Sequence, residues 1–541
     1  MKSADLRDIE GRGENFRRIE LNYGRLESEP YQPPQVFKDA KYDWPGDWEG
    51  RTILALVMLV QATHREPKYL AQIMEELPRH LNVEGYFGPM MQADRIDEQQ
   101  LSGNGWFLRS LTEYYRWKPD PTILGYITAI VQNLYLRTKG AYPAYPTDPK
   151  VRKRARGGMI GHRGPQPAGR WVVSSDIGCA FIALDGLSQA EDVLHLPALR
   201  ELLDEMIAKF LTIDLRGLSF QTHATLSATR GILRYSESRN DPALLAAAER
   251  IYRLYWTEAL TENYENFNWF NRPQHTEACA IIDSFLVAFN LWRLTGKADY
   301  LEMAHLIYFN GMGYGQRPNG GFGCDICAGA TRGNGVSGKD RKNRKFVAPS
   351  PGGFEAFWCC TMRGGEGLAK SLEYSFLYDS QIVILPFYND ATFTVRFEDG
   401  SAAVKETAGY PYEGFISLEI VESVIATGKN LKLYVPSFAL NVKAEVNGSD
   451  RPIPVENQFA TLAIPFVRGT RIQLTFDIPL RAETRLNAHN RRGYSTWRHG
   501  NLILGIDSPL HAVQLGNKPQ FDPLGRGKYR LHGTDCREPG V

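Results

Sequence analysis

The stretch FLVAFNLWRLTGKADYLEMAHLIYFNGM, residues 285–312, indicates a pair of helices. Apolar residues recur three and four positions apart on both sides of Gly296, which is the pattern of an amphipathic helix. The junction GKADYL, which begins at Gly296, places an Asp where it can open the second helix. The stretch therefore predicts a helical hairpin.

The same pattern extends from about residue 50 to residue 378, in paired segments of roughly 12 to 20 residues. Related junctions begin at Arg65, Trp117, Leu194 and Arg239. Most of them place Pro or Asp at a helix start, where the missing N–H of Pro does no harm. About eleven or twelve helices are expected, and their spacing is too uneven for a short solenoid repeat. We therefore predict a closed (α/α)6 toroid, or barrel, of helical hairpins.

The periodicity changes near Tyr378. Segments such as ATFTVRFEDG (391–400) and TRIQLTFDI (470–478) alternate apolar and polar residues, which is typical of strands with one buried face. Asp-Gly and Asn-Gly pairs supply hairpin turns between such segments. The prediction is an α+β multidomain chain. It comprises an (α/α)6 barrel catalytic domain at 1–378, an antiparallel β-sandwich at 379–515 and a C-terminal tail at 516–541.

Composition excludes several classes of protein. The chain has 541 residues, with 63 Lys and Arg against 61 Asp and Glu, so it offers no strongly basic field to nucleic acid. The longest apolar stretch, Ile53 to Val60, is far below the ~18 residues of a membrane span. The amino terminus is charged and lacks the apolar core of an export signal. We expect a cytoplasmic protein without nucleic-acid or membrane partners.

The cysteines suggest a metal site. Seven is an odd number, so they cannot all form disulfides, and five lie between residues 279 and 360. Glu277 and Cys279 are two apart and share a face in extended chain. Cys359 and Cys360 are adjacent and can converge where the backbone bends. Together they would give zinc three thiolates and one carboxylate, a chemically reasonable set.

Spacing alone leaves two alternatives open. A structural four-cysteine zinc site could be built from Cys324, Cys327, Cys359 and Cys360. The thiols could also simply be buried, as small apolar side chains often are. We give no role to Cys179, which lies alone in an apolar segment.

The segments around these cysteines resemble a known family. TEAC (276–279), followed some eighty residues later by the Cys359-Cys360 pair, resembles glycoside hydrolase family 127, the β-L-arabinofuranosidase type. WEGRTILALVMLVQAT (48–63) and THATLSATRGILRYSES (222–238) are similar to helices of that family. The resemblance covers roughly residues 40 to 515.

The resemblance implies an (α/α)6 barrel with β-sandwich material and a zinc ion bound by Glu277, Cys279, Cys359 and Cys360. It implies that Cys359 is the nucleophile of a retaining glycosidase and that His223 faces the substrate. Zinc would keep the sulfur of Cys359 deprotonated at neutral pH. The expected substrate is an oligosaccharide or glycoside with a terminal furanoside, in the first place a β-L-arabinofuranoside.

The proton-transfer carboxylate has two candidates. The family's acid/base lies sixteen residues before the ligand glutamate, which here is Thr261, with Glu262 next to it. Glu265, in YENFNWF, matches the family's local E-x-F context at a spacing of twelve. Glu265 is favoured slightly, because loops change length more readily than a local motif is lost, and both residues are kept.

Four further residues are candidates for binding the sugar. Asn104 stands where the family has a histidine, and His275 is a possible replacement for that contact. Trp269 and Trp358 could present their rings to the apolar face of a sugar.

Two other functions are compatible with the sequence. A carbohydrate lyase or epimerase could use the same toroid without a covalent intermediate. A non-catalytic carbohydrate-binding protein could keep a structural four-cysteine zinc. A homodimer is also possible.

Overall fold

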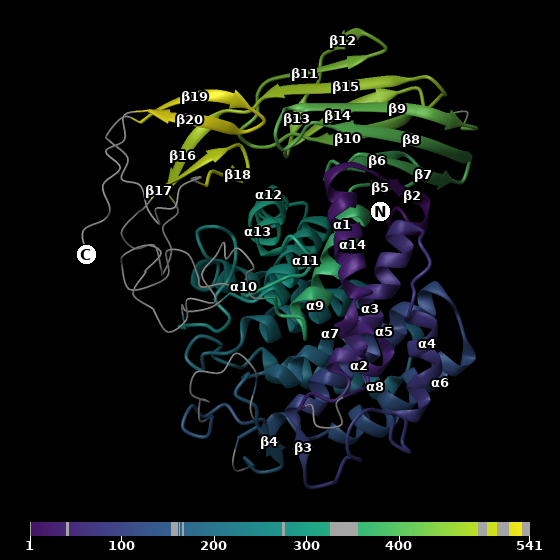
Figure 1. Cartoon of the computed structure of the whole chain (residues 1–541), viewed down its shortest axis with the longest axis vertical. Coiled ribbons are helices and arrows are strands. Elements are labelled where there is room, and N and C mark those ends of the chain that lie inside the picture. The colour runs from purple at the N-terminus through teal and green to yellow at the C-terminus, as the bar shows by residue number, and fades with distance from the viewer. Residues whose placement is uncertain are drawn as a thin grey trace.

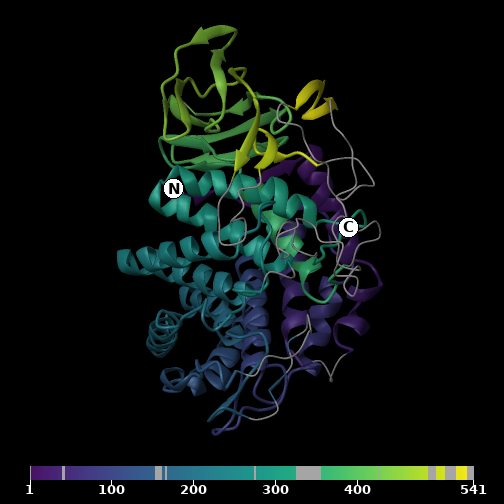
Figure 2. The ribbon, with the colours of Figure 1, turned by 90° about the vertical axis from the view of Figure 1, so that its left-hand side faces the viewer.

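The computed structural model describes residues 2–38, 43–152, 161, 163–164, 167–272, 276–324, 355–425, 427–484, 495–505 and 519–532. Its helices gather in one part of the molecule and most of its strands form a layered cap at one end of that part (Figures 1 and 2). This arrangement is the predicted mixture of a helical toroid and antiparallel sheets.

Within the described chain, six helices form a closed inner ring, in which each helix packs against the next and the last packs against the first. In ring order they are α3 (Asp47–Thr63), α5 (Glu98–Trp117), α7 (Ala183–Leu194), α9 (Thr222–Arg239), α11 (Ala278–Thr295) and α14 (Cys360–Glu373). Each packs against an outer helix, in the same order α4 (Leu70–Glu76), α6 (Pro121–Ile130), α8 (Pro197–Phe210), α10 (Pro242–Glu258), α12 (Ala298–Leu306) and α1 (Gly13–Leu26). The predicted (α/α)6 barrel is therefore confirmed. Short helices α2 (Pro33–Val36) and α13 (Gly313–Gly315) lie outside these pairs.

The outer helices begin at the junctions that the sequence predicts. Asp120 and Asp241 accept hydrogen bonds from the first backbone N–H groups of α6 and α10, and a Pro follows each of them. These aspartates satisfy N–H groups that would otherwise lack partners. Gly296 ends α11 in the left-handed conformation, at φ 70°, which a residue without a Cβ adopts readily.

Glycines allow the inner helices to touch. A Cβ added to Gly50 of α3 would lie 2.4 Å from the backbone N of Phe107 in α5. A Cβ added to Gly231 of α9 would lie 2.4 Å from the carbonyl carbon of Leu184 in α7. These contacts fix the spacing of the ring, because any larger residue would push the helices apart.

A buried network of charged side chains joins four of the inner helices. Arg230 donates to Asp283 at 2.7 Å and to Glu366 at 2.8 Å, and Arg363 pairs with both carboxylates. Arg109 lies 3.4 Å from Glu366. Arg230 is 7% exposed and the other side chains are 2% exposed or less, so the network joins α5, α9, α11 and α14 away from water.

Two sheets form the main β-part of the described chain. The first has the order β1 (Lys2–Ser3), β5 (Leu377–Tyr378), β6 (Ile382–Leu385), β10 (Lys429–Tyr434), β14 (Phe459–Ile464) and β13 (Val455–Glu456). The second has the order β12 (Ser449–Arg451), β11 (Leu440–Val446), β15 (Arg471–Asp477), β9 (Phe415–Ser423), β8 (Gly400–Ala408), β7 (Ala391–Phe397) and β2 (Ile9–Gly11). All pairings in these two sheets are antiparallel except that of β6 with β10, which is parallel.

Smaller sheets complete the fold. They are formed by β16 (Leu480–Thr484), β17 (Ser495–His499) and β18 (Leu502–Ile503), by β19 (Gln520–Gly525) and β20 (Lys528–His532), and by β3 (Ile96–Asp97) and β4 (Trp171–Val172). The predicted tail thus contains a hairpin. The domain boundaries at 378 and 515 stay predictions, but β1 and β2 add strands from the amino terminus to both large sheets. Residues 2–11 therefore belong to the β-part, contrary to the prediction that 1–378 is all barrel.

Helix α11 is long and apolar enough to cross a membrane by length and composition alone. It is an inner helix of the barrel, however, and 78% of it is buried inside the fold. Its apolar character is therefore explained by its place in the core.

Candidate active site

A pocket lies at the end of the barrel where the inner helices begin. Its walls come from the starts of α3, α7, α9, α11 and α14 and from the loops that precede them. The lining residues are Trp44, Asp47, Arg51, Gly161, Asp176, Ile182, Gln221, His223, Glu277, Trp358 and Cys359. Helix N-termini carry a partial positive charge, so this end of the barrel favours thiolates and carboxylates.

Three sulfurs meet beside the pocket. Cys359 immediately precedes α14 and Cys360 begins it, while Cys279 lies in the first turn of α11. Cys360 Sγ lies 3.4 Å from Cys359 Sγ and 3.7 Å from Cys279 Sγ. A carboxylate oxygen of Glu277 lies within 4.8 Å of Cys279 Sγ. Three of the four predicted metal ligands, Cys279, Cys359 and Cys360, thus form one group, and Glu277 lies beside Cys279.

The spacing of these donors fits zinc. In a tetrahedral zinc site with Zn–S bonds of about 2.3 Å, neighbouring sulfurs lie about 3.8 Å apart. The two Sγ–Sγ distances at Cys360 are close to that value. Three thiols and a carboxylate are also donors that zinc accepts. The residues present therefore suit a zinc ion, although the geometry alone does not name the metal.

Cys324 approaches this cluster from one side only. Its Sγ lies 3.7 Å from Cys360 Sγ. Nevertheless, it is not part of the group in which the sulfurs of Cys279, Cys359 and Cys360 all lie within 4.8 Å of one another. Glu277 is likewise outside that group and is joined to it through Cys279. Cys327 lies outside the described residues. The four-cysteine alternative, which needs Cys327, therefore stays a prediction beside the set with Glu277.

The thiols differ in acidity. Burial opposes ionisation of Cys360, but hydrogen bonds from Cys279, Cys324 and Cys359 hold its pKa well below the ordinary value. Hydrogen bonds to Cys279 and then to Cys360 raise the pKa of Cys359. The cluster by itself therefore favours a thiolate at Cys360, and ionising its other thiols requires a nearby cation. Arg51 supplies one positive charge, with Nη1 3.5 Å from Cys279 Sγ.

His223 lies on the pocket wall, as expected for a residue that faces the substrate. Its Nδ1 is 3.3 Å from Glu277 Oε1 and its Nε2 is 3.5 Å from Asp283 Oδ2. Gln221 Nε2 donates to Glu277 Oε2 at 3.4 Å. His223 and Gln221 therefore also fix the orientation of the Glu277 carboxylate, which is a common role for residues around a metal ligand.

Asp176 is a pocket residue that the sequence analysis did not identify. Burial, together with the negative charge of Glu277, raises the pKa of Asp176 to about 8. A carboxyl group with this pKa is protonated at neutral pH and can donate a proton. Asp47 and Arg51 were also missed, and they form an ion pair of 2.8 Å on the same wall. Asp47 and Arg51 could have been identified from the sequence only by their position at the start of an inner helix.

The two predicted acid/base glutamates are not among the described residues that line the pocket. Glu265 is 1% exposed, and its Oε2 accepts a hydrogen bond of 2.7 Å from Asn263. The adjacent Asn266 faces the site instead, since its Oδ1 accepts from the backbone N of Glu277. Glu262 lies in the same loop. The loop therefore reaches the site, but through Asn266.

Asn104 has a structural role, which corrects its prediction as a sugar contact. Its Oδ1 accepts from the backbone N of Phe87, and its Nδ2 donates to the carbonyls of Pro45, Phe87 and Gln100. The amide is fully used and does not line the pocket. The flanking glycines have a packing role as well, because a Cβ at Gly105 would lie 2.8 Å from Ala183 Cα.

Of the two tryptophans predicted to contact the sugar, one lines the pocket and the other does not. Trp358 lines the pocket next to Cys359. Trp269 is 3% exposed and is not among the described residues that line the pocket, although its backbone pairs with that of Gln221, which does. Arg272 packs over its ring at 4.1 Å. His275 lies outside the described residues.

Comparisons with known proteins bear on this site. Residues 214–373 match the family model described as β-L-arabinofuranosidase, GH127 catalytic domain. A comparison with curated proteins finds no match.

Among solved structures, a GH127 β-L-arabinofuranosidase from Geobacillus stearothermophilus T6 is similar, with a TM-score of 0.70 and 14% identity over 95% of this chain and 89% of that chain. A GH127 β-arabinofuranosidase gives a TM-score of 0.70 and 14% identity over 98% of this chain and 90% of that chain. A protein described as a glycoside hydrolase gives 0.70 and 13%, covering 98% and 89%. At this identity the structures show a shared fold.

The matched segment runs from Asp214 to Glu373 and includes His223, Glu277 and the three clustered cysteines. The family model and the shared fold thus confirm the predicted resemblance to glycoside hydrolase family 127, whose catalytic-domain model residues 214–373 match.

Proposed function

We propose that this chain is a retaining glycoside hydrolase that removes a terminal furanoside, β-L-arabinofuranose, from an oligosaccharide or glycoside. The observation that carries the proposal is the position of Cys359. Its sulfur belongs to the three-sulfur cluster, and the residue lines the pocket. The family model that matches residues 214–373 supports the choice of sugar.

We assign a zinc ion to Glu277, Cys279, Cys359 and Cys360. Zinc bound there would keep the sulfurs deprotonated at neutral pH. The spacing of the donors supports this assignment, as does the orientation of Glu277 by His223 and Gln221.

Cys359 then acts as the nucleophile. Its thiolate attacks the anomeric carbon, a C–S bond forms, and the C–O bond to the aglycone breaks. A carboxylic acid donates its proton to the departing oxygen. The resulting carboxylate removes a proton from water, and the hydroxide attacks the same carbon. The C–S bond breaks, the thiolate and the acid are restored, and two inversions give net retention.

Three carboxyl groups are candidates for the proton transfer. Glu265 and Glu262 are supported by the family's local sequence context. Asp176 is supported by geometry, because it lines the same pocket as Cys359. Its raised pKa also gives it the protonated state that the first step needs at neutral pH. The described geometry favours Asp176.

Other pocket residues suit a neutral sugar. Gln221 and His223 present polar atoms at the pocket wall, and Trp358 presents a ring beside the nucleophile. Such a combination matches the hydroxyls and the apolar face of a furanose. A site built on free thiolates also favours a reducing compartment, so we propose a cytoplasmic location.

The central test compares Cys359→Ser with Cys324→Ser in the full chain. We expect Cys359→Ser to lower kcat for aryl β-L-arabinofuranosides by about 10³-fold or more. We expect Cys324→Ser, the matched control, to retain zinc and activity. Metal content and hydrolysis of an aryl glycoside panel are the measurements.

Three outcomes would change the assignment. Full activity in Cys359→Ser would exclude it as nucleophile and favour a lyase or epimerase that needs no covalent step. Loss of metal in Cys324→Ser would support the structural four-cysteine site. No turnover of any glycoside by the zinc-loaded parent would favour a carbohydrate-binding protein.

A second experiment identifies the acid/base. Without the carboxylate, water is no longer activated to attack the covalent sugar–enzyme intermediate. Azide can attack this intermediate without a base, so the correct alanine variant recovers turnover when azide is added. We expect rescue for Asp176→Ala. Rescue of Glu265→Ala or Glu262→Ala instead would restore the assignment made from the family's sequence context.

A further inference from the structure

A second cavity lies at the other end of the barrel, where the inner helices finish. It has a volume of about 370 Å³ and is lined by the C-terminal halves of α5, α9, α11 and α14 together with Lys2 and Ser3. Small-molecule sites typically span about 300 to 1,000 Å³. On α9, His223 of the pocket and Arg230 of this cavity are seven residues apart, or about 10 Å along the helix axis, and the two linings share no described residue. The cavity is therefore separate from the candidate active site.

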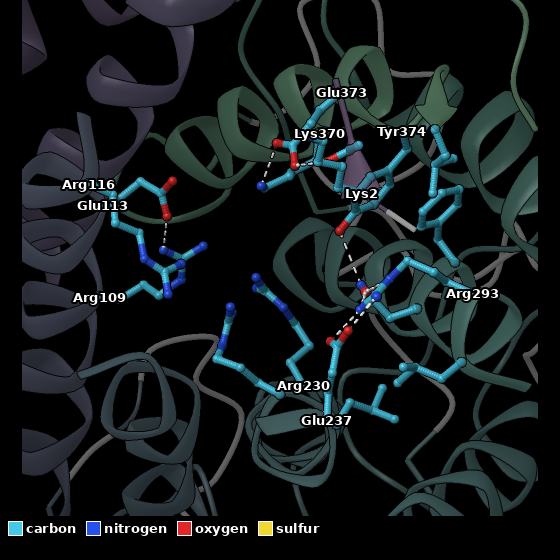
Figure 3. A pocket seen from close by; sticks show the side chains of 17 residues that line it. Lys2, Arg109, Glu113, Arg116, Arg230, Glu237, Arg293, Lys370, Glu373 and Tyr374 are labelled. Atoms are coloured by element: carbon cyan, nitrogen blue, oxygen red, sulfur yellow. Dashed lines mark hydrogen bonds and ion pairs between the residues drawn. The ribbon is translucent and has the colours of Figure 1, made fainter. Parts of the chain in front are cut away.

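Positive side chains dominate the lining of this cavity. Among the described residues, seven Lys and Arg side chains and three glutamates line it. Figure 3 shows the charged ends of Arg109, Arg116, Arg230 and Lys370 directed toward one central space from different sides. Four separate side chains therefore converge on the same volume.

The nearby carboxylates are mostly placed behind or beside these cations. Glu366 and Asp283 hold Arg230 from the barrel interior, and both are fully buried. On the opposite wall, Glu237 is occupied by two hydrogen bonds from Arg293 (Figure 3). These three carboxylates therefore do not point into the central space, which the cationic side chains surround.

The remaining carboxylates hold the other cations, and two of them serve more than one group. Glu113 accepts from Arg109 at 2.6 Å and also from Gln189 at 2.9 Å. Glu373 accepts from Lys370 at 2.5 Å. Asp185 holds Arg234 at 2.9 Å and also lies 3.4 Å from both Arg109 and Arg230. Each of these contacts uses only part of the hydrogen-bonding capacity of the cation, since a guanidinium has five N–H donors and an ammonium has three.

Arg116 is the cavity cation whose charged form is disfavoured. It forms a partly exposed ion pair with Asp192, at 3.1 Å. Burial, and then repulsion from Arg234, lower the pKa of Arg116, and attraction by Glu113 and Asp192 opposes this only in part. An anion in the cavity would relieve this repulsion and use the free N–H donors.

We propose that this cavity binds a phosphate-class oxyanion in the central space toward which Arg109, Arg116, Arg230 and Lys370 are directed. The ligand is either inorganic phosphate or the phosphate group of a small metabolite, since both present the same oxygens. The opposite ends of α5, α9, α11 and α14 lie at or near the catalytic pocket. Anion binding would therefore stabilise the positions of the helices that form the pocket.

The alternative is that these cations only stabilise helix ends. Cations near a helix C-terminus interact favourably with its dipole, and Arg116, Arg293 and Lys370 all lie in last turns. That role requires no ligand and predicts no saturable binding. Binding measurements therefore distinguish the two.

The test is calorimetric titration of the full chain with inorganic phosphate at constant ionic strength, together with Tm measured over the same concentrations. We expect saturable binding, and a rise in Tm that an equal ionic strength of chloride does not produce. A sugar phosphate and the corresponding free sugar form a second arm. Tighter binding of the sugar phosphate than of phosphate, with none for the free sugar, would identify a metabolite as the source.

The variants are Arg116→Gln and Lys370→Gln, with Arg137→Gln as the matched control. Arg137 is a partly exposed arginine that pairs with Glu84 away from the cavity. We expect at least a tenfold weaker Kd in each cavity variant and an unchanged Kd in the control. Circular dichroism confirms folding, and either cavity variant alone suffices if the other does not fold. Absence of saturable binding to the parent, or equal Kd values in all variants, would overturn the proposal.

Discussion

His305 provides a stability test that is independent of the active site. It lies in α12, is fully buried, and its Nε2 is 2.8 Å from the carbonyl oxygen of Pro386. Its ring stacks on Phe387 at 4.1 Å and on Tyr434 at 4.3 Å between centroids. The histidine therefore joins the helical barrel to the β-part. Burial lowers its pKa to about 3.

The sign and size of the effect follow from this shift. A histidine in the unfolded chain has a pKa near 6.5. Between pH 6.5 and pH 3 the unfolded chain therefore binds a proton at His305 that the native chain does not bind. The stabilisation is complete above pH 6.5 and declines as the pH falls toward 3. Each pH unit is worth about 1.4 kcal/mol, so His305 contributes a loss of about 2 kcal/mol between pH 8 and pH 5.

The assay is urea unfolding of the parent and of His305→Phe at pH 8 and at pH 5. Phenylalanine keeps a ring in the stack but cannot bind a proton. Loss of the hydrogen bond to Pro386 lowers the stability of the variant similarly at both pH values, so it cancels in the difference. We expect the free energy of unfolding of the parent to fall by about 2 kcal/mol more than that of the variant. An equal fall in both proteins would refute the reasoning.

Three further predictions concern the ring and the pocket. Glu366→Gln should destabilise the fold by about 3 to 5 kcal/mol in urea unfolding, because Arg230 keeps its buried charge and loses a partner. Gly50→Ala should lower stability by about 1 to 3 kcal/mol in the same measurement, since the new methyl meets the backbone of Phe107. If Asp176 is the acid, kcat/KM should fall as the pH rises through about 8, and Asp176→Asn should lose this alkaline limb together with most activity.

The two stability predictions have matched control variants. Glu237→Gln removes a partly exposed ion pair and should change stability by less than about 1 kcal/mol. Gly125→Ala adds a methyl with no atom within 4 Å and should be neutral or stabilising. Equal losses in test and control variants would contradict the packing and charge arguments. For Asp176, the charged groups that set its pKa are Glu277, Arg272, Asp47 and Glu98, and an unchanged alkaline limb in Asp176→Asn would assign that limb elsewhere.

The barrel was predictable because its signals are local. Helical periodicity and the Asp-Pro starts at Asp120 and Asp241 lie within single segments. The strands β1 and β2 have two and three residues, which is too short to display a period of two. The parallel pairing of β6 with β10 was also invisible, because alternation marks a half-buried strand but not the direction of its neighbour.

The site was predictable only in part, for a related reason. Glu277 and Cys279, and likewise Cys359 and Cys360, are close in sequence, so each pair can be recognised as a motif. Asp176 acquires its chemistry only when ring closure buries it near Glu277. Asn104 was misinterpreted because it stands where the family has a histidine, whereas its amide holds the backbone around Phe87 and its flanking glycines permit close packing of inner helices.

The chain is nearly neutral overall, but charged groups of opposite sign lie at the two ends of the barrel. The six inner helices of the described ring all begin near the catalytic pocket, so their partial positive charges gather where Glu277 and the thiols lie. Their C-termini gather at the other end, and the last turns there carry Arg116, Arg293 and Lys370. Complementing helix dipoles explains why acidic groups collect at one end and basic groups at the other. It does not explain why cationic side chains from three helices converge on one cavity, and that convergence is what phosphate binding accounts for.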